Sequence, residues 1–591
     1  MALIVHILVR LLAGFVALAV VVLALFAARL SAGPLSLSLL TPIIQRALEA
    51  ATPYRFHIGD GWMLWQDWRR GLLVHLNDVQ VNGNGDALLA GIRDVAVAFS
   101  AEAMASGVLA PSSVKASDAV ITLNRGPEGL WPASPRNSGE DSGQFFADTL
   151  AGLRSPPDAR RPLSFLFDVN LDDVTVNVEG PPSAEDLRMR VAEAQFTRDE
   201  AAALRGSASF ILSHADEDAA VSLKLGSGGP DDPVDGHLDF SGFRPAAFAG
   251  LAPDLAPLAV VDTALQGNIS LVFASDGTLG QADVAVSGGP GALVLTRDLA
   301  SASGLATPEQ RLPLRNLAMQ AVLVPSEARY TVRNAELLFE PGTMVYVPSP
   351  VDHRYPLLLL SGNGSYVKGR LSIPSLDADL GDLRLTATTT VENLSTAASG
   401  TAMVTARHVK VDDFRRYWPP KAAPGAYDWC IKHLRDGVVP QATARLAFAR
   451  RNGATEVTSL DADFGVERLT VDYLPPMPPV RGATGAARVD LKKMTIEITG
   501  GRSAGLAIRS GTAHFPDLDR HIPSIDIDLT VAGAVRDAMN LIAHEPLAYP
   551  QKIGISPAQT SGGLSARLKL GFPLLAALEI EQMDIKAAVD L

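Results

Sequence analysis

Residues 524–531 read Ser-Ile-Asp-Ile-Asp-Leu-Thr-Val, and this alternation of apolar and polar side chains decides the fold. Successive side chains of a β-strand point to opposite faces, so the aliphatic residues of this stretch share one face and the aspartates share the other. Such a strand is typical of an antiparallel sheet that has one face in water. The stretch therefore predicts half-buried antiparallel strands.

The same period of two recurs over most of the chain. It is clear at 95–99, 174–178, 494–499 and 567–570, and turn-forming clusters such as residues 82–85 separate the strands. No strand alternates with long helical stretches, so a parallel α/β enzyme fold is not expected. We predict a mainly β protein with a few short helices.

An internal repeat indicates how the strands are organised. Residues 375–386 (SLDADLGDLRLT) align without gaps to residues 459–470 (SLDADFGVERLT), with nine of twelve positions identical. A length of 591 residues would otherwise suggest about four domains. The repeat favours stacked β modules in one elongated antiparallel array, which must curl or fold over because open twisted sheets rarely exceed about ten strands.

The composition fits a folded, acidic chain. Hydrophobic residues make up 47% and charged residues 19%, which lies outside the disordered class. The 51 basic and 64 acidic side chains give a net charge of -13, which repels phosphate backbones, so nucleic acid is not an expected partner. The single cysteine, Cys430, excludes an intrachain disulfide framework and a cysteine-rich metal site.

An apolar segment near the N-terminus predicts a membrane anchor. Residues 11–28 are uncharged and stand between Arg10 and Arg29; as a helix they would span about 27 Å, close to a hydrocarbon core of roughly 30 Å. A cleaved signal peptide is the alternative, but its apolar region is usually only about 7–15 residues long. We expect an uncleaved span followed by a short amphipathic helix that begins at Thr41-Pro42.

No motif of catalysis or metal binding has its required context. Gly501 to Gly505 matches G-x-S-x-G, but strand patterns on both sides predict a hairpin turn and not a nucleophile elbow. His544-Glu545 is followed by proline and lacks the second histidine of a zinc helix. Asp377, Asp379 and Asp382 lack calcium-loop spacing and predict a solvated strand face or a turn. Cys430 is expected to be a packing residue. We therefore expect neither an enzyme nor a bound cofactor or metal.

The order of features resembles the AsmA-like family of Gram-negative bacteria, and within it the YhdP branch, with TamB as a more distant relative. The resemblance rests on residues 72–81, 97–131 and 473–501, and most specifically on YWPPKAAPGAYDWCIKHLRDGVV at 417–439. It extends over essentially the whole chain. Tyr427 departs from the arginine expected after Gly-Ala. The strand pattern is still running at Leu591, which favours an N-terminal portion of a longer protein or a short family member.

The resemblance implies a protein of the bacterial inner membrane, with a single span and its bulk in the periplasm. Its sheet would form a curled groove lined by aliphatic side chains, similar to bridge-like lipid transfer proteins. Phospholipids would be its ligands, carried between inner and outer membranes to support outer-membrane homeostasis, with an outer-membrane protein as a further expected partner.

The expected organisation combines the anchor, the resemblance and two interruptions of the strand pattern. We expect a cytoplasmic N-terminus at 1–10, an anchor at 11–30, an N-terminal β region at 31–132, a polar linker with one short helix at 133–162, β-groove modules at 163–410, a helical insert with the YWP motif at 411–437 and further modules at 438–591.

The candidate groove residues are aliphatic side chains from the clearest alternating strands. They are Val174, Val176, Val178, Ile496, Ile498, Ile525, Ile527 and Leu529. A sheet with one apolar face and no partner sheet must bury that face on something, and an acyl chain is suitable. The same alternation also fits packed β-sandwiches in a TamB-like scaffold or assembly factor for outer-membrane proteins, and this alternative stays open here.

Overall fold

A computed structural model of the chain describes most residues from 55 onward. The structure describes residues 33–38, 55–66, 71–82, 88–126, 129–131 and most of 155–590, together with residues 152–153 and a few others within 29–54. Within 155–590 it has gaps at 180–185, 200–202, 296–308, 348–350, 394–397 and 576–581, and several breaks of one or two residues. The predicted anchor, residues 11–28, and most of the predicted linker lie outside the described residues. In the described part of the chain, no helix is both long and apolar enough to cross a membrane.

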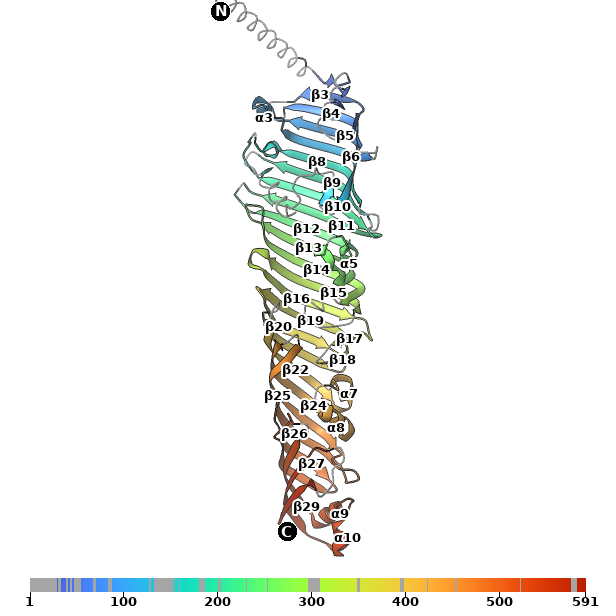
Figure 1. Cartoon of the computed structure of the whole chain (residues 1–591), viewed down its shortest axis with the longest axis vertical. Helices are drawn as coiled ribbons and strands as arrows, with labels where there is room; N and C mark the ends of the chain where they lie inside the picture. Colours follow the sequence, from blue (N-terminus) through green and yellow to red (C-terminus); the bar gives the residue numbers. More distant parts are fainter. Residues whose placement is uncertain are drawn as a thin grey trace, which may run out of the picture. The chain divides into compact units, whose positions relative to one another are not determined.

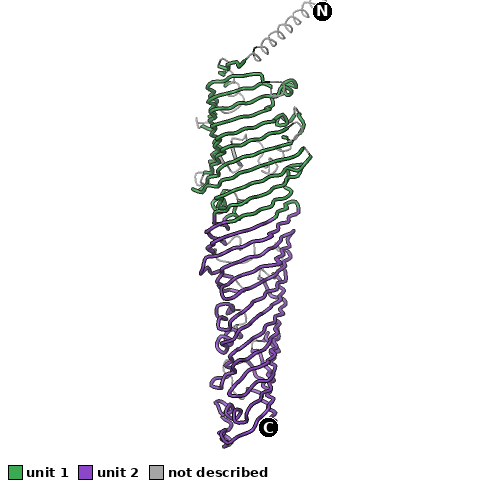
Figure 2. Tube along the Cα trace, turned by 180° about the vertical axis from the view of Figure 1, so that it is seen from behind, with its two compact units in different colours: residues 1–258, 264–287, 322–326 green, residues 259–263, 288–321, 327–591 purple. Residues whose placement is uncertain are grey.

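The chain divides into two compact units, shown in different colours in Figure 2. Unit 1 contains residues 1–258, 264–287 and 322–326, and unit 2 contains residues 259–263, 288–321 and 327–591. Within each unit, most strands follow one another as successive rungs (Figure 2). The prediction of a mainly β protein with few short helices is confirmed.

Unit 1 is a sheet of mostly long strands. Its strands are β1 (Leu35–Ser36), β2 (Arg55–Ile58), β3 (Gly61–Trp65), β4 (Leu72–Asn82), β5 (Leu88–Phe99), β6 (Pro111–Gly126), β7 (Gly129–Trp131), β8 (Asp168–Glu179), β9 (Leu187–Arg198), β10 (Leu204–His214), β11 (Glu217–Ser227) and β12 (Val234–Phe243). Short helices are α3 (Ala101–Ala105) and α5 (Pro245–Phe248), and the 3-10 helix η1 (Pro162–Phe165). The elements η2 (Pro253–Val260), β13 (Val261–Phe273), β14 (Leu279–Leu295), β15 (Gln310–Val324) and η3 (Pro325–Glu327) contain residues of both units.

One strand pair of unit 1 departs from the predicted antiparallel pattern. β6 and β8 are parallel, with Ser113 opposite Asp168, while β3–β4–β5–β6 and β8 through β12 pair in the antiparallel sense. Parallel neighbours require a crossover connection of a dozen or more residues. The segment between β6 and β8, which contains the predicted linker 133–162, supplies that length. The sheet is therefore not antiparallel throughout.

Unit 2 is an antiparallel series. In order, β16 (Arg329–Phe339), β19 (Leu359–Val367), β20 (Arg370–Asp379), β21 (Arg384–Glu392), β22 (Ser399–Lys410), β24 (Val438–Arg451), β25 (Ala454–Val471), β26 (Val480–Asp490), β27 (Met494–Ser503), β28 (Leu506–Phe515), β29 (Ser524–Ala534), β30 (Gly563–Pro573) and β31 (Asp584–Asp590) each pair with the next. β17 (Met344–Val347) and β18 (His353–Pro356) form a separate hairpin, and β23 (Leu434–Arg435) pairs with β25.

The helices of unit 2 gather at one set of strand ends, which we call the helical rim. They are η4 (Val411–Asp413), α7 (Phe414–Tyr417), α8 (Pro424–His433), α9 (Val535–Ile542), α10 (Tyr549–Ile553) and η5 (Pro557–Gln559). These helices connect β22 to β24 and β29 to β30 on the side labelled α7 to α10 in Figure 1. Because consecutive strands run in opposite directions, the β20–β21, β25–β26 and β27–β28 turns lie on the same rim.

The two copies of the internal repeat have different local structures. In the first, β20 ends at Asp379, whose carboxylate accepts a hydrogen bond of 2.8 Å from Gly381 N, and β21 begins at Arg384. Gly381 has a φ of 92°, a left-handed conformation that suits a tight turn. In the second, all twelve residues lie inside the single strand β25, with a register irregularity around Arg468. The similar sequences therefore share the residue pattern of a β-strand, but they do not form the same supersecondary unit.

Glycines in unit 2 allow close approach between strands, and Gly511 is the clearest case. A Cβ atom at Gly511 would lie 2.3 Å from Leu529 Cδ2 and 2.8 Å from Asp528 O. We expect Gly511→Val to lower the free energy of unfolding by about 1–3 kcal/mol through overpacking. Gly289→Val is the matched control, since a Cβ there meets nothing within 4 Å. Equal urea midpoints for the two variants would contradict this packing.

Candidate functional site

The apolar residues predicted on β27 and β29 lie on one face of unit 2. Directly opposite residues in antiparallel strands share a face. One row therefore runs from Ile496 through Ala513 and Ile527 to Leu570. A second, parallel row consists of Ile498, Gly511, Leu529 and Leu568. We call these two rows the aliphatic face.

Each row of the aliphatic face has one small residue between two large ones. Ala513 stands between two isoleucines, and Gly511 stands between Ile498 and Leu529. A face that bends inward crowds its side chains, and alternation of large and small residues relieves that crowding. The sequence alone could not reveal this feature, because it appears only once the register of β27, β28 and β29 is known.

The central side chains of the aliphatic face are half-buried although strands flank them on both sides. Ile496, Ile498, Ile527 and Leu529 are all of intermediate exposure, whereas Ile525 is only 8% exposed. Ile525 stands opposite Phe572 near the end of β29. A second sheet packed on this face would bury such side chains almost completely. Partial exposure of these four side chains therefore shows that described residues cover this part of the face incompletely, although Ala513 in the same rows is only 5% exposed.

The opposite face of the same strands is polar and charge-paired. Arg567 Nε and Nη2 donate to the two carboxylate oxygens of Asp528 at 2.8 and 2.7 Å. This guanidinium holds the pKa of Asp528 below its ordinary value. Thr495 and His514 lie 3.1 Å apart between Oγ1 and Nδ1 on the neighbouring strands. The sheet thus separates an aliphatic face from a hydrated one.

The three candidate valines on β8 lie in unit 1, in a more closely packed setting. Val174 is 5% exposed and Val178 9%, and Val176 is half-buried. Val174 contacts a cluster that includes Ala119 and Val191, from β6 and β9. Burial therefore places Val174 and Val178 in packed core, and the half-buried Val176 packs against the same cluster as Val174.

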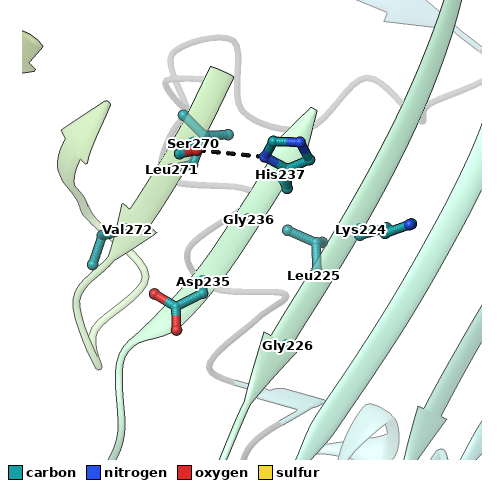
Figure 3. Close-up of a pocket in the computed structure, with 9 residues that line it drawn as sticks. All are labelled: Lys224, Leu225, Gly226, Asp235, Gly236, His237, Ser270, Leu271 and Val272. Atoms are coloured by element: carbon teal, nitrogen blue, oxygen red, sulfur yellow. Dashed lines mark hydrogen bonds between the residues drawn. The ribbon is translucent and has the colours of Figure 1, made fainter. Parts of the chain in front are cut away.

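A hollow of about 310 Å³ lies across β11, β12 and β13 of unit 1 (Figure 3). Gly236 stands between Leu225 and Leu271 in register, and a Cβ there would lie 3.1 Å from Leu225 Cδ2. The missing side chain therefore opens a notch in an aliphatic row. On the same strands, His237 contacts Ser270 Oγ at 3.4 Å and Asp239 at 3.2 Å. His237 and Asp239 are about half exposed, which suits a hydrated face better than a shielded catalytic relay.

The G-x-S-x-G segment is a hairpin turn, as predicted. Ser503 stands opposite Leu506, and the two residues between them, Ala504 and Gly505, have φ values of 48° and 90°. Two positive φ angles in a two-residue loop are typical of a type I′ turn. Ser503 Oγ donates to Pro478 O at 3.0 Å, so the hydroxyl is used in packing.

The aspartates of the repeat have separate polar partners. Asp377 accepts a hydrogen bond from Ser375, and Asp382 pairs with Arg416 at 3.3 Å. Asp461 and Asp463 both face Arg445, at 3.8 and 3.3 Å. These carboxylates lie on turns or a solvated strand face, as expected. Within the described residues, no group of three or more His, Cys, Asp or Glu side chains is arranged to hold a metal ion.

The YWP segment fastens the helical insert to neighbouring strand ends. Tyr417, 8% exposed, donates from its hydroxyl to Leu380 O at 3.2 Å. His353 Nε2 contacts Arg416 O at 2.9 Å, and Lys421 pairs with Asp352. The insert therefore docks on the β20–β21 turn and on the β17–β18 hairpin. The pattern of residues 411–437 predicted a helix but not this docking, which depends on contacts over 37 to 69 residues of sequence.

Cys430 has the properties of a packing residue. Desolvation raises the pKa of its thiol to about 11, so the nucleophilic thiolate is scarce near neutral pH. We expect its alkylation by iodoacetamide near pH 8 to be on the order of a hundredfold slower in the folded protein than in guanidinium chloride, where the pKa returns to about 8.5. Equal rates in the two conditions would show that the thiol is not desolvated.

Comparison with known proteins identifies the family. The family model described as YhdP protein matches residues 273–587, which is more than half of the chain. No curated protein matches the chain. The match includes most of the described strands of unit 2, the helical insert and the aliphatic face. The chain therefore belongs to the YhdP family.

Proposed function

We propose that this protein transfers phospholipid between the inner and outer membranes of the bacterial envelope, with lipid acyl chains lying against its aliphatic sheet face. The observation that carries the proposal is the partial exposure of Ile496, Ile498, Ile527 and Leu529 in the interior of a long antiparallel sheet. Membership of the YhdP family, whose proteins belong to the bacterial envelope, supports the same assignment.

Acyl chains are suitable occupants because they match the face chemically. Burial of one CH₂ group contributes about 0.8 kcal/mol, so shielding a sixteen-carbon chain would contribute roughly 10 kcal/mol. Equivalent aliphatic rungs repeat from strand to strand at about 4.8 Å. The free energy of a bound chain is then similar at successive positions, which permits sliding without a large barrier. The polar headgroup would stay in water at the strand ends.

In this proposal, residues 11–30 anchor the protein in the inner membrane, and the sheet lies in the periplasm. The apolar run at 11–28 supports this arrangement on sequence grounds. The aliphatic face would lie on the inner side of a curled sheet, and the alternation of Ile496, Ala513 and Ile527 supports that curvature.

The alternative is a scaffold for outer-membrane proteins, built of packed β-sandwiches. A sandwich requires two sheets whose inner faces interdigitate and lose nearly all exposure. The half-buried state of Ile527, with Ala513 and Leu570 as its strand neighbours, does not favour this arrangement. Catalysis has no supporting side-chain arrangement among the described residues, so we do not propose an enzyme.

Lipid contact can be tested directly with a photo-crosslinking amino acid in living cells. We expect phospholipid adducts when the crosslinker replaces Ile527 or Ile496. Glu497 is the matched control, since it lies on the opposite face of β27 and is exposed. Adducts at Ile527 that contain only neighbouring protein segments, and no lipid, would contradict lipid binding by the aliphatic face and favour a β-sandwich.

A charge on the aliphatic face should block transfer without unfolding the sheet. We expect Ile527→Asp to retain the β-sheet circular dichroism signal, because the site is half-buried and its carboxylate can reach water, and to lose lipid transfer between labelled vesicles. Thr530→Asp is the control: it lies on the other face of β29, opposite Arg567. Gross unfolding of Ile527→Asp would identify the position as packed core.

A further inference from the structure

Two arginines stand directly opposite each other on β26 and β27, at the helical rim. Arg481 and Arg502 are register partners, and both are exposed. Opposite positions in an antiparallel pair place Cβ atoms about 4.5–5.5 Å apart, and like charges there are destabilising. Within the described chain neither guanidinium forms an ion pair or a side-chain hydrogen bond. The arrangement therefore has a cost that no described protein group offsets.

Carboxylates that could offset this cost are plentiful in the chain, in which acids outnumber bases by 64 to 51. Several arginines on other strands are neutralised from a neighbouring strand, as in Arg567 with Asp528, Arg445 with Asp463 and Arg93 with Asp118. A carboxylate opposite Arg481 or Arg502 would neutralise that arginine in the same way. The carboxylate of Asp537 lies close to the Gly505 turn and still does not pair with Arg502.

The arginine pair lies beside one end of the aliphatic face. Arg502 is one residue from the β27–β28 turn, and its neighbour Gly501 stands opposite Ile508, which stands opposite Val531. A Cβ at Gly501 would lie 3.0 Å from Val480 Cγ1 and 3.3 Å from Ile508 Cδ1. The strand end is thus aliphatic on one face and dicationic on the other. An arginine side chain is long enough to reach round a strand end.

A second pair of opposed arginines occupies the same rim. Arg384 and Arg407 are register partners on β21 and β22, next to the β20–β21 turn. Arg384 contacts Asp379 at 3.6 Å and is otherwise exposed, and Arg407 forms no ion pair with any described residue. Four strand spacings separate the two pairs, which is about 19 Å along the rim.

We infer that Arg481 and Arg502 bind the phosphate of an anionic lipid headgroup while its acyl chains lie on the aliphatic face. Guanidinium groups on two directly opposite residues can both donate charge-assisted hydrogen bonds to one phosphate, and a bound anion would offset their mutual repulsion. Arg384 and Arg407 would hold a headgroup at a second position on the same path. This inference rests on the proposed lipid transfer and adds headgroup selection at a named place.

The test uses the purified full chain and soluble probes that separate headgroup from chain. Binding of dihexanoyl phosphatidylglycerol, hexyl glucoside and inorganic phosphate is measured by titration calorimetry for the wild type and for Arg481→Gln/Arg502→Gln. Arg445→Gln/Arg567→Gln is the control, because it removes two exposed arginines and changes the net charge equally. We expect the site variant to bind the phospholipid at least about tenfold more weakly and the control to bind as the wild type does.

The other probes distinguish failure of this inference from failure of the proposed function. Hexyl glucoside should bind the wild type and the site variant equally, since it has no phosphate and needs only the aliphatic face. If the glucoside binds but the site variant retains full phospholipid affinity, the headgroup site is wrong and the lipid-binding face stands. If neither amphiphile binds the wild type, the proposed function itself fails. Inorganic phosphate binding as tightly as phospholipid would overturn the lipid assignment.

Discussion

The structure of unit 2 depends on one constraint: a long antiparallel sheet presents aliphatic side chains on one face, where Ile496, Ile498, Ile527 and Leu529 remain partly exposed. Exposed apolar area is unfavourable in water at roughly 25 cal/mol per Å², so a face of this kind favours an occupant. The polar face needs none, because arginine and aspartate side chains pair across its strands, as Arg567 and Asp528 do. The asymmetry between the two faces is the physical basis of the proposed function.

Elements outside the sheet pack against the ends of its strands. Tyr417 and its neighbours fix the helical insert to the β20–β21 turn, and Phe339 is buried at the end of β16. Much of the closest packing of unit 2 therefore lies at the rim and not over the sheet. This distribution leaves the middle of the strands available to a ligand. It also gives the YWP motif, the most distinctive motif of the chain, a structural role in fastening the helical insert.

Much of the fold could be predicted from local sequence, because the alternation of residues 524–531 depends only on the two-residue period of a strand. The hairpin at 501–505 followed from its flanking strands in the same way. The parallel β6–β8 pair was missed, since pairing direction depends on a crossover and not on periodicity. The two copies of the repeat differ in local structure, because Gly381 turns the chain where Gly465 continues a strand. Burial of Val174, and the opposition of Arg481 and Arg502, depend on neighbours that only register reveals.

The central claim is that the aliphatic face carries lipid, and native mass spectrometry of the protein released from membranes in a neutral detergent tests it most directly. We predict discrete mass additions that correspond to phospholipids and that exchange when deuterated phospholipid is supplied. A protein that is released from the membrane without bound lipid, and that takes up no lipid on incubation with vesicles, would contradict the account.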